Sequence, residues 1–118
     1  MFDWTSFGKV KFKGDVYNCD VYVDTEMNIH ERSDMAHERF GSGHTICADE
    51  LRGILSDDAK ALVIGTGQSG CAALADDAEK LVKERGIELH VLESPAAIKK
   101  YNELCIQKKT VALIHVTC

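Results

Sequence analysis

The segment near the end of the sequence constrains the fold more than any other. Residues Val111 to Val116 are apolar at odd and even positions alike, with His115 as the one polar side chain. A strand that is apolar on both faces is covered on both sides, as happens in sheets that lie between layers of helices. The run Ala61 to Ile64 has the same character. We therefore expect a sheet that is covered by helices on both of its faces.

The second half of the chain alternates between helix and strand patterns. Asp76 or Asp77 is placed to cap a helix that ends at Gly86. The next strand is predicted over Ile87 to Leu92, and Ser94-Pro95 begins a further helix with a capping serine and a proline at its first position. Strands that alternate with helices predict right-handed crossovers and parallel pairing.

The first third of the chain follows a different pattern, that of an antiparallel meander. Phe7 to Lys13 alternates between apolar and polar residues, Val16 to Val23 continues as a second strand, and Ile29 to Arg32 is a short third strand. Ser33 to Thr45 shows no regular pattern, and a short helix around Leu51 follows it.

These patterns together predict the fold class. A chain of 118 residues suits one domain, because 100 to 150 residues is the commonest domain size. We expect an α/β fold over residues 1–118: a single compact three-layer domain with a central mixed sheet flanked by helices. The N-terminal third adds an antiparallel β-hairpin or meander.

Charge and composition exclude some functions. The formal net charge of −5 argues against nucleic-acid binding, which needs a dense basic face to displace counterions from phosphates. No run approaches the roughly 18 apolar residues of a membrane span. The five cysteines are an odd number without a CxxC pair, so we expect reduced thiols and a cytoplasmic protein.

The sharpest local motif is the GxGxxG sequence from Gly65 to Gly70, directly after a predicted strand. Such a loop can cradle a pyrophosphate with its backbone N–H groups. The next helix, however, begins only at Asp76 or Asp77, and no lysine follows the glycines, so neither a dinucleotide fingerprint nor a Walker loop is complete. We expect a structural turn and no cofactor.

The histidines are the other candidates for a site. His30, His37 and His44 recur every seven residues but lack a zinc-site spacing, so no metal is expected. His115 and Cys118 fall on opposite faces of a strand, which argues against an activated thiol. His44 meeting His115 at a cleft above the sheet remains open. The alternative ligand or anion pocket would therefore comprise Gly65, Thr66, Gly67, Ser69, Gly70, His44, His115 and Cys118.

The motifs, taken in order, resemble one family along nearly the whole chain. The matching pieces are Phe7 to Val10, Gly14 with Tyr17 and Asp20, Gly41 to His44, Ile64 to Gly67, Val91 to Glu93, Ala97 to Asn102 and Ile114 to Cys118. This sequence resembles the adipogenesis-associated Mth-domain family, which also contains a mitochondrial complex I assembly factor. The resemblance implies a compact α/β fold, no established chemical activity, and action through partner proteins.

Two functional hypotheses follow. The first is a non-catalytic binding, assembly or regulatory module that acts through a protein partner, because no complete catalytic constellation is present. It predicts an exposed apolar or aromatic patch that includes Phe2 or Trp4, and a homodimer is also compatible with it. The second is a small enzyme or ligand-binding protein with a cleft at the glycine loop, near His44 and His115.

Overall fold

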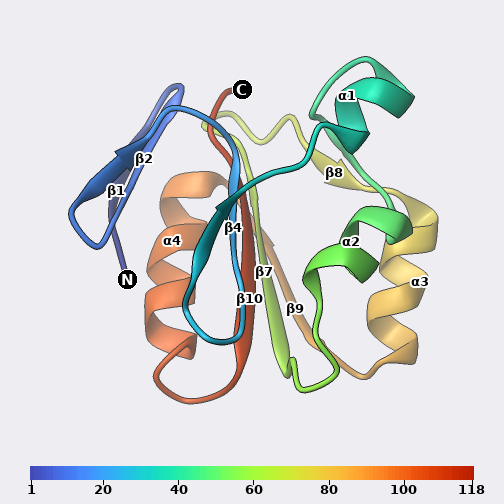
Figure 1. The fold of residues 1–118 in the computed structure, drawn as a ribbon. Helices are drawn as coiled ribbons and strands as arrows, with labels where there is room; N and C mark the ends of the chain where they lie inside the picture. Colours follow the sequence, from blue (N-terminus) through green and yellow to red (C-terminus); the bar gives the residue numbers. More distant parts are fainter.

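The computed structural model describes residues 1–118 and contains a five-stranded mixed sheet at its centre (Figure 1). The strand order is β5-β4-β10-β7-β9. β10 lies in the middle, parallel to β7 and antiparallel to β4. The bounds are Val21–Val23 for β4, Ile29–Glu31 for β5, Ala61–Thr66 for β7, Glu88–Leu92 for β9 and Thr110–His115 for β10.

Helices cover both faces of this sheet, as the two-sided apolar pattern predicts. In Figure 1, α4 (Ser94–Leu104) lies on one side of the sheet, and α2 (Ala48–Ile54) and α3 (Asp76–Glu84) lie on the other. Side chains of β10 alternate between the two layers. Ala112 and Ile114 pack in the core on the α4 side, whereas Val111 and Leu113 pack in the core beneath α2 and α3. The three-layer α/β fold is confirmed.

The N-terminal residues form a separate antiparallel sheet in the order β1-β2-β3, with bounds Phe2–Ser6, Lys9–Phe12 and Asp15–Tyr17. Its inner face packs on α4, where the Phe2 ring lies 5.3 Å from that of Tyr101 and 4.9 Å from that of Phe12. The Asn102 amide bonds both the N–H and the C=O of Phe2. The additional antiparallel β element that the sequence predicts is therefore present, and it packs on α4.

Two details of the strands differ from the sequence prediction. β1 was not anticipated, because its residues Phe2–Ser6 give no clear alternation. Val16 to Val23 was expected to be one strand, but residues 18–20 interrupt it between β3 and β4. The interruption has a physical reason: β3 belongs to the N-terminal sheet and β4 to the central sheet, so the chain must change direction between them.

The irregular middle of the chain contains short elements. These are α1 (Met35–Phe40), β6 (Thr45–Ile46) and β8 (Ala73–Leu74), and β6 and β8 pair in parallel. Elements of two to six residues carry too few positions to show a period, which is why the pattern did not predict them. No helix of the structure has the length and hydropathy needed to cross a membrane.

Two helix starts also lie one residue before the predicted caps. Ala75 occupies the N-cap of α3 and Glu93 that of α4, and neither side chain caps its helix. Ser94, the predicted cap of α4, is fully buried, and its hydroxyl bonds the carbonyl of His115 and the N–H of Gly67. The contacts available in the core therefore outweigh the local capping preference of this serine.

Candidate functional site

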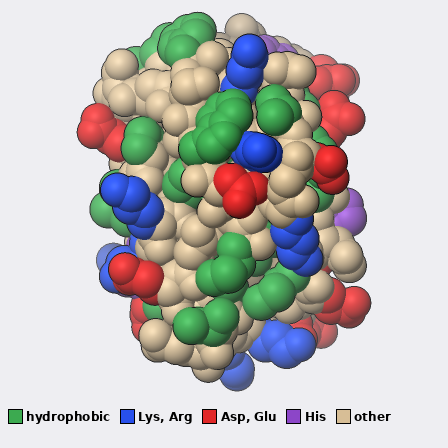
Figure 2. All heavy atoms as spheres, turned by 90° about the vertical axis from the view of Figure 1, so that its left-hand side faces the viewer, with side chains coloured by type: hydrophobic (Ala, Val, Ile, Leu, Met, Phe, Trp, Pro, Cys, Tyr) green, Lys and Arg blue, Asp and Glu red, His purple; other side chains and the backbone are tan.

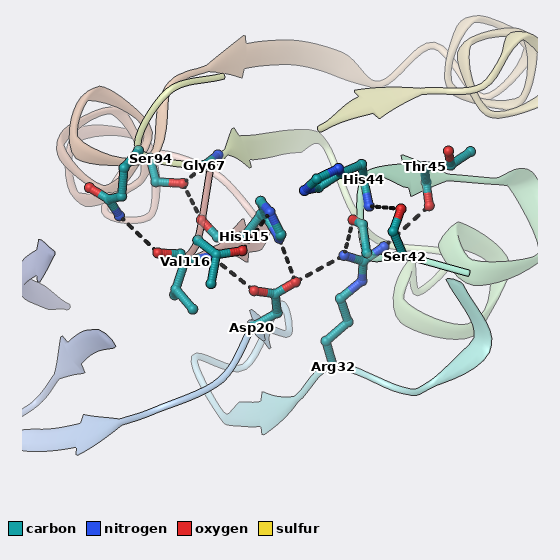
Figure 3. Close-up of polar contacts among 12 residues, drawn as sticks. Asp20, Arg32, Ser42, His44, Thr45, Gly67, Ser94, His115 and Val116 are labelled. Carbon is teal, nitrogen blue, oxygen red and sulfur yellow. Dashed lines mark hydrogen bonds and ion pairs between the residues drawn. The ribbon is translucent and has the colours of Figure 1, made fainter. Parts of the chain in front are cut away.

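A polar cavity of about 360 Å³ opens at the carboxyl end of β10. The segments that precede β4 and follow β5 form part of its wall. Its walls come from widely separated parts of the chain. The side chains that matter for its chemistry are Asp20, Arg32, His37, His44, His115 and Thr117. Figure 3 shows how Asp20, Arg32, His44 and His115 converge there.

Arg32 is the central charge of this site, and its side chain is only 4% exposed. Its guanidinium donates to both carboxylate oxygens of Glu50, at 2.6 and 2.8 Å. It also donates to Asp20 at 3.0 Å, to the Gly43 carbonyl at 2.7 Å and to the Thr45 carbonyl at 3.3 Å (Figure 3). An arginine side chain has five N–H donors, and all five are used within the protein. Arg32 therefore has no donor left for an external anion.

Asp20 joins this arginine to the end of the central strand. One carboxylate oxygen is 2.8 Å from Nδ1 of His115, and the other accepts the N–H of Val116 at 2.8 Å. Burial raises the pKa of Asp20, but the bonds from His115, Val116 and Arg32 outweigh that effect and leave the pKa below its usual range. The carboxylate is therefore held in its ionised form.

His115 is oriented from both of its ring nitrogens. Nδ1 faces Asp20, and Nε2 lies 3.1 Å from the Thr117 hydroxyl. The two side chains therefore lie on the same side of the chain, as strand alternation places residues two positions apart. The His44 ring meets the His115 ring edge to face, with centroids 5.2 Å apart and planes at 89°. The predicted meeting of His44 and His115 at the end of the sheet is confirmed.

The glycine loop does not line this cavity. Its backbone N–H groups are instead used to hold the segment after β10: Gln68 donates to the Thr117 carbonyl at 2.7 Å, and Ser69 donates to the Cys118 carbonyl at 3.0 Å. Gly67 donates to the Ser94 hydroxyl. The amides that would cradle a phosphate are therefore occupied by the chain itself, as expected for a structural turn.

The remaining residues of the expected pocket lie around that turn. Gly65 and Thr66 belong to β7, and the Thr66 hydroxyl bonds the Leu92 carbonyl. Gly67 has φ = +109°, and a Cβ there would lie 2.3 Å from the carbonyl carbon of Cys118. The structure thus brings His44 and His115 together, whereas Gly65, Thr66, Gly67, Ser69, Gly70 and Cys118 are not among the residues that line the cavity.

Sequence reasoning missed the charged members of the site. The sequence patterns place Arg32 at the end of a strand and Glu50 in the short helix around Leu51, and Asp20 enters only through the family resemblance. No local signal identifies them, because a buried ion pair between residues 18 positions apart leaves no spacing pattern. The structure has no group of three or more His, Cys, Asp or Glu side chains that could hold a metal ion.

The outer face of the N-terminal sheet is the second candidate. Trp4 pairs with Lys11, which pairs in turn with Val16, so these three side chains form a row on the face opposite to that of Phe2, Val10 and Phe12. Trp4 also borders a hollow that Pro95, Ile98 and Lys99 of α4 help to line. Trp4 is 40% exposed, Val16 47% and Phe7 67%. Figure 2 views the side where this sheet lies and shows hydrophobic side chains beside lysines. The expected patch is present with Trp4, whereas Phe2 is buried.

Comparison with known proteins gives a family and a fold. A family model described as "Protein of unknown function (DUF498/DUF598)" matches residues 2–115. A conserved hypothetical protein from Pyrococcus horikoshii OT3 is 29% identical, with a TM-score of 0.92 over 100% of this chain and 99% of that one. The protein MT938 is 28% identical, with a TM-score of 0.83 over 100% and 98%. A Bordetella parapertussis protein, 16% identical over 98% and 96%, shares the fold with a TM-score of 0.73.

Proposed function

The chain belongs to the DUF498/DUF598 family of proteins of unknown function, and we propose that it is a non-catalytic module that binds a partner protein. The partner docks on the outer face of the N-terminal sheet. The resemblance to Mth-domain proteins, which implies action through partners in assembly or regulation, supports the same role.

The observation that carries this proposal is the row Trp4–Lys11–Val16, together with Phe7, which is exposed in the turn between β1 and β2. Large apolar side chains gathered on an exposed face mark interaction sites in soluble proteins. Trp is also among the residues that contribute most to binding free energy in protein interfaces. Neither Trp4 nor Phe7 is needed to complete a core, because both remain 40% or more exposed while Phe2, Val10 and Phe12 fill the inner face.

The charges on this face indicate the chemistry of the partner. Lys9 and Lys11 alternate with Val10 and Phe12 along β2, so both lysines lie on the outer face with Trp4. A partner with apolar side chains flanked by Asp or Glu complements this arrangement. Pairing of two copies through the same face would bring like charges together, which disfavours that form of homodimer.

The proposal is tested by capturing the tagged protein from its host after chemical cross-linking. We expect Trp4→Ser with Phe7→Ser to abolish recovery of the partner, and Lys11→Glu to reduce it at least tenfold. Ile106→Ser is the matched control, because Ile106 is 73% exposed in the turn after α4, outside the N-terminal sheet.

Two outcomes would contradict the proposal. One is a partner that is recovered equally well with the Trp4 and Phe7 variants. The other is a partner that is lost with Ile106→Ser as well, since that result would reflect general destabilisation. Recovery of only a second copy of the chain would replace the acidic partner by a homodimer.

A ligand in the polar cavity is the second candidate, and the meeting of His44 with His115 is what favours it. The complete pairing of Arg32 argues against an anion there. Native mass spectrometry of the protein from its host separates the two candidates. A stoichiometric small molecule that is lost on His44→Ala would establish ligand binding, whereas a bare chain or a chain with a polypeptide partner agrees with our proposal.

A further inference from the structure

The backbones of two cysteines, Cys71 and Cys118, are in contact where the loop after β7 meets the segment after β10. The N–H of Cys71 donates to the carbonyl oxygen of Cys118 at 3.0 Å, and Ser69 donates to the same oxygen at 3.0 Å. Figure 1 shows this loop passing close to the C-terminal segment. Residues far apart in the sequence are thus held together by the backbone itself.

This hydrogen bond limits the distance between the two Cα atoms. Within Cys118 the carbonyl oxygen lies about 2.4 Å from Cα, and within Cys71 the nitrogen lies about 1.46 Å from Cα. Joined by the 3.0 Å bond, the Cα atoms can be at most about 6.9 Å apart, and any bend at the carbonyl oxygen shortens this. Disulfides span about 4.4 to 6.8 Å between Cα atoms. The hydrogen bond therefore keeps the two Cα atoms from separating appreciably beyond the upper end of the range that a disulfide bridges.

Both thiols are also accessible and free. Cys71 is exposed and Cys118 is half-buried. The glycine loop makes their approach possible, because Gly67 and Gly70 adopt φ values of +109° and +75°, and only the absence of a side chain at Gly67 allows the loop to lie against Cys118.

The other three cysteines are in environments that suppress thiol reactivity. Burial, with a hydrogen bond from the thiol to Glu31, raises the pKa of Cys19 to about 11. Burial also raises the pKa of Cys105, and Cys47 is only 4% exposed. Because the thiolate is the nucleophile in disulfide exchange, Cys19 and Cys105 react slowly and Cys47 is shielded.

We propose that Cys71 and Cys118 form a redox-active dithiol, a site that closes to an intramolecular disulfide by exchange with a small disulfide such as oxidised glutathione. The thiolate of one cysteine attacks glutathione disulfide, forms a mixed disulfide and releases one glutathione thiolate. The second cysteine attacks the protein sulfur of the mixed disulfide and releases the second glutathione. The protein loses two electrons and two protons, and the glutathione disulfide becomes two thiols.

Closing this bond has a structural effect on the polar cavity. The bridge would tether Cys118 to the loop, and with it the neighbouring Thr117, whose hydroxyl bonds His115. It would also enclose β8, α3, β9, α4 and β10 in one covalent loop. Cross-linking a long loop lowers the entropy of the unfolded chain, so the oxidised protein should melt about 5 °C or more above the reduced one.

The test equilibrates the full chain with oxidised and reduced glutathione, quenches with acid, and counts thiols after denaturation. The reduced chain should show all five of its thiols, and the oxidised chain should lose two of them. Intact mass should fall by the two hydrogens of the reaction. Proteolysis without reductant should yield one linked peptide pair that contains Cys71 and Cys118.

Single serine variants supply the controls. Cys71→Ser and Cys118→Ser should each lose the linked peptide and the rise in melting temperature, and should instead accept one glutathione. Cys19→Ser and Cys105→Ser should oxidise as the wild type does. The proposal is overturned if the wild type keeps all five thiols, if it forms only glutathione adducts or linked dimers, or if Cys71→Ser still loses two thiols.

Discussion

The carboxyl end of the central sheet and the outer face of the N-terminal sheet differ in whether their side chains have partners within the protein. At the first, Arg32 has every donor paired inside the protein. At the second, the large apolar side chains of Trp4 and Phe7 remain 40% and 67% exposed. The difference teaches that a conspicuous group of buried charges is here part of the architecture, whereas the groups left without partners are the apolar ones on the surface.

Removal of Arg32 is the strongest test of the stabilising role of the buried charges. Arg32→Met leaves Asp20 and Glu50 as buried carboxylates without their cation, and it should lower the free energy of unfolding by about 3 to 5 kcal/mol. Urea denaturation measures this. Arg52→Met is the control: its side chain is 56% exposed in its pair with Asp49, so the loss should stay within about 1 kcal/mol. Equal losses would show that the buried network contributes no more than a surface pair.

A substitution in the glycine loop beside His115 should cause the next largest loss of stability. Gly67→Ala places a Cβ 2.3 Å from the carbonyl carbon of Cys118 at φ = +109°, so it should cost about 3 kcal/mol. Gly53→Ala in α2 meets nothing within 4 Å and should instead stabilise the protein by about 0.5 kcal/mol. Thermal melting of both variants checks the pair. A folded Gly67→Ala protein of unchanged stability would contradict the structural role of this turn.

Lowering the pH tests the buried charges further, with a smaller expected change in the free energy of unfolding. Because hydrogen bonds lower the pKa of Asp20 in the folded protein, its stabilisation is complete above the unfolded pKa of about 3.9 and is lost as pH falls through the lower folded value. Asp20→Asn should therefore flatten the decline of unfolding free energy below about pH 4. Asp57→Asn, at an exposed position, should keep the wild-type slope. Identical slopes for all three proteins would rule out this role of Asp20.

The smallest effect on stability belongs to the outer face. Phe7 is 67% exposed, so Phe7→Ser should change the free energy of unfolding by no more than about 0.5 kcal/mol. Chemical denaturation checks this value. A loss above about 1.5 kcal/mol would mean that Phe7 supports the fold, and the exposed face would then no longer be free for a partner.

The sequence predicted the layers of the fold because long apolar strands and amphipathic helices carry their own periods. The two-sided pattern of Val111 to Val116 placed β10 inside the sheet, and the alternation of Val10 and Phe12 placed one face of β2 inside the protein. It did not predict that β4 leaves the N-terminal sheet and joins β10. That choice depends on tertiary pairing, which short strands such as Val21–Val23 do not encode locally.

The candidate site was only partly predictable. The sequence left open a meeting of His44, in the irregular segment that begins at Ser33, with His115 at the end of the sheet, and the two rings do meet there. The partners of His115 could not be predicted, because Asp20 reaches it across 95 residues of sequence. The cap preference of Ser94 was overridden for the same reason, since a buried carbonyl and a buried N–H needed its hydroxyl more than the helix did.

The position of β10 also governs the order in which the sheet can assemble. β10 follows every other strand in the sequence, yet it joins the β4–β5 pair to the β7–β9 pair. During synthesis on the ribosome, the two pairs have no shared edge until residues 110–115 emerge from the exit tunnel. The complete sheet therefore forms only after β10 has emerged, and a nascent chain stalled before residue 110 would expose two half-sheets with apolar edges to chaperones.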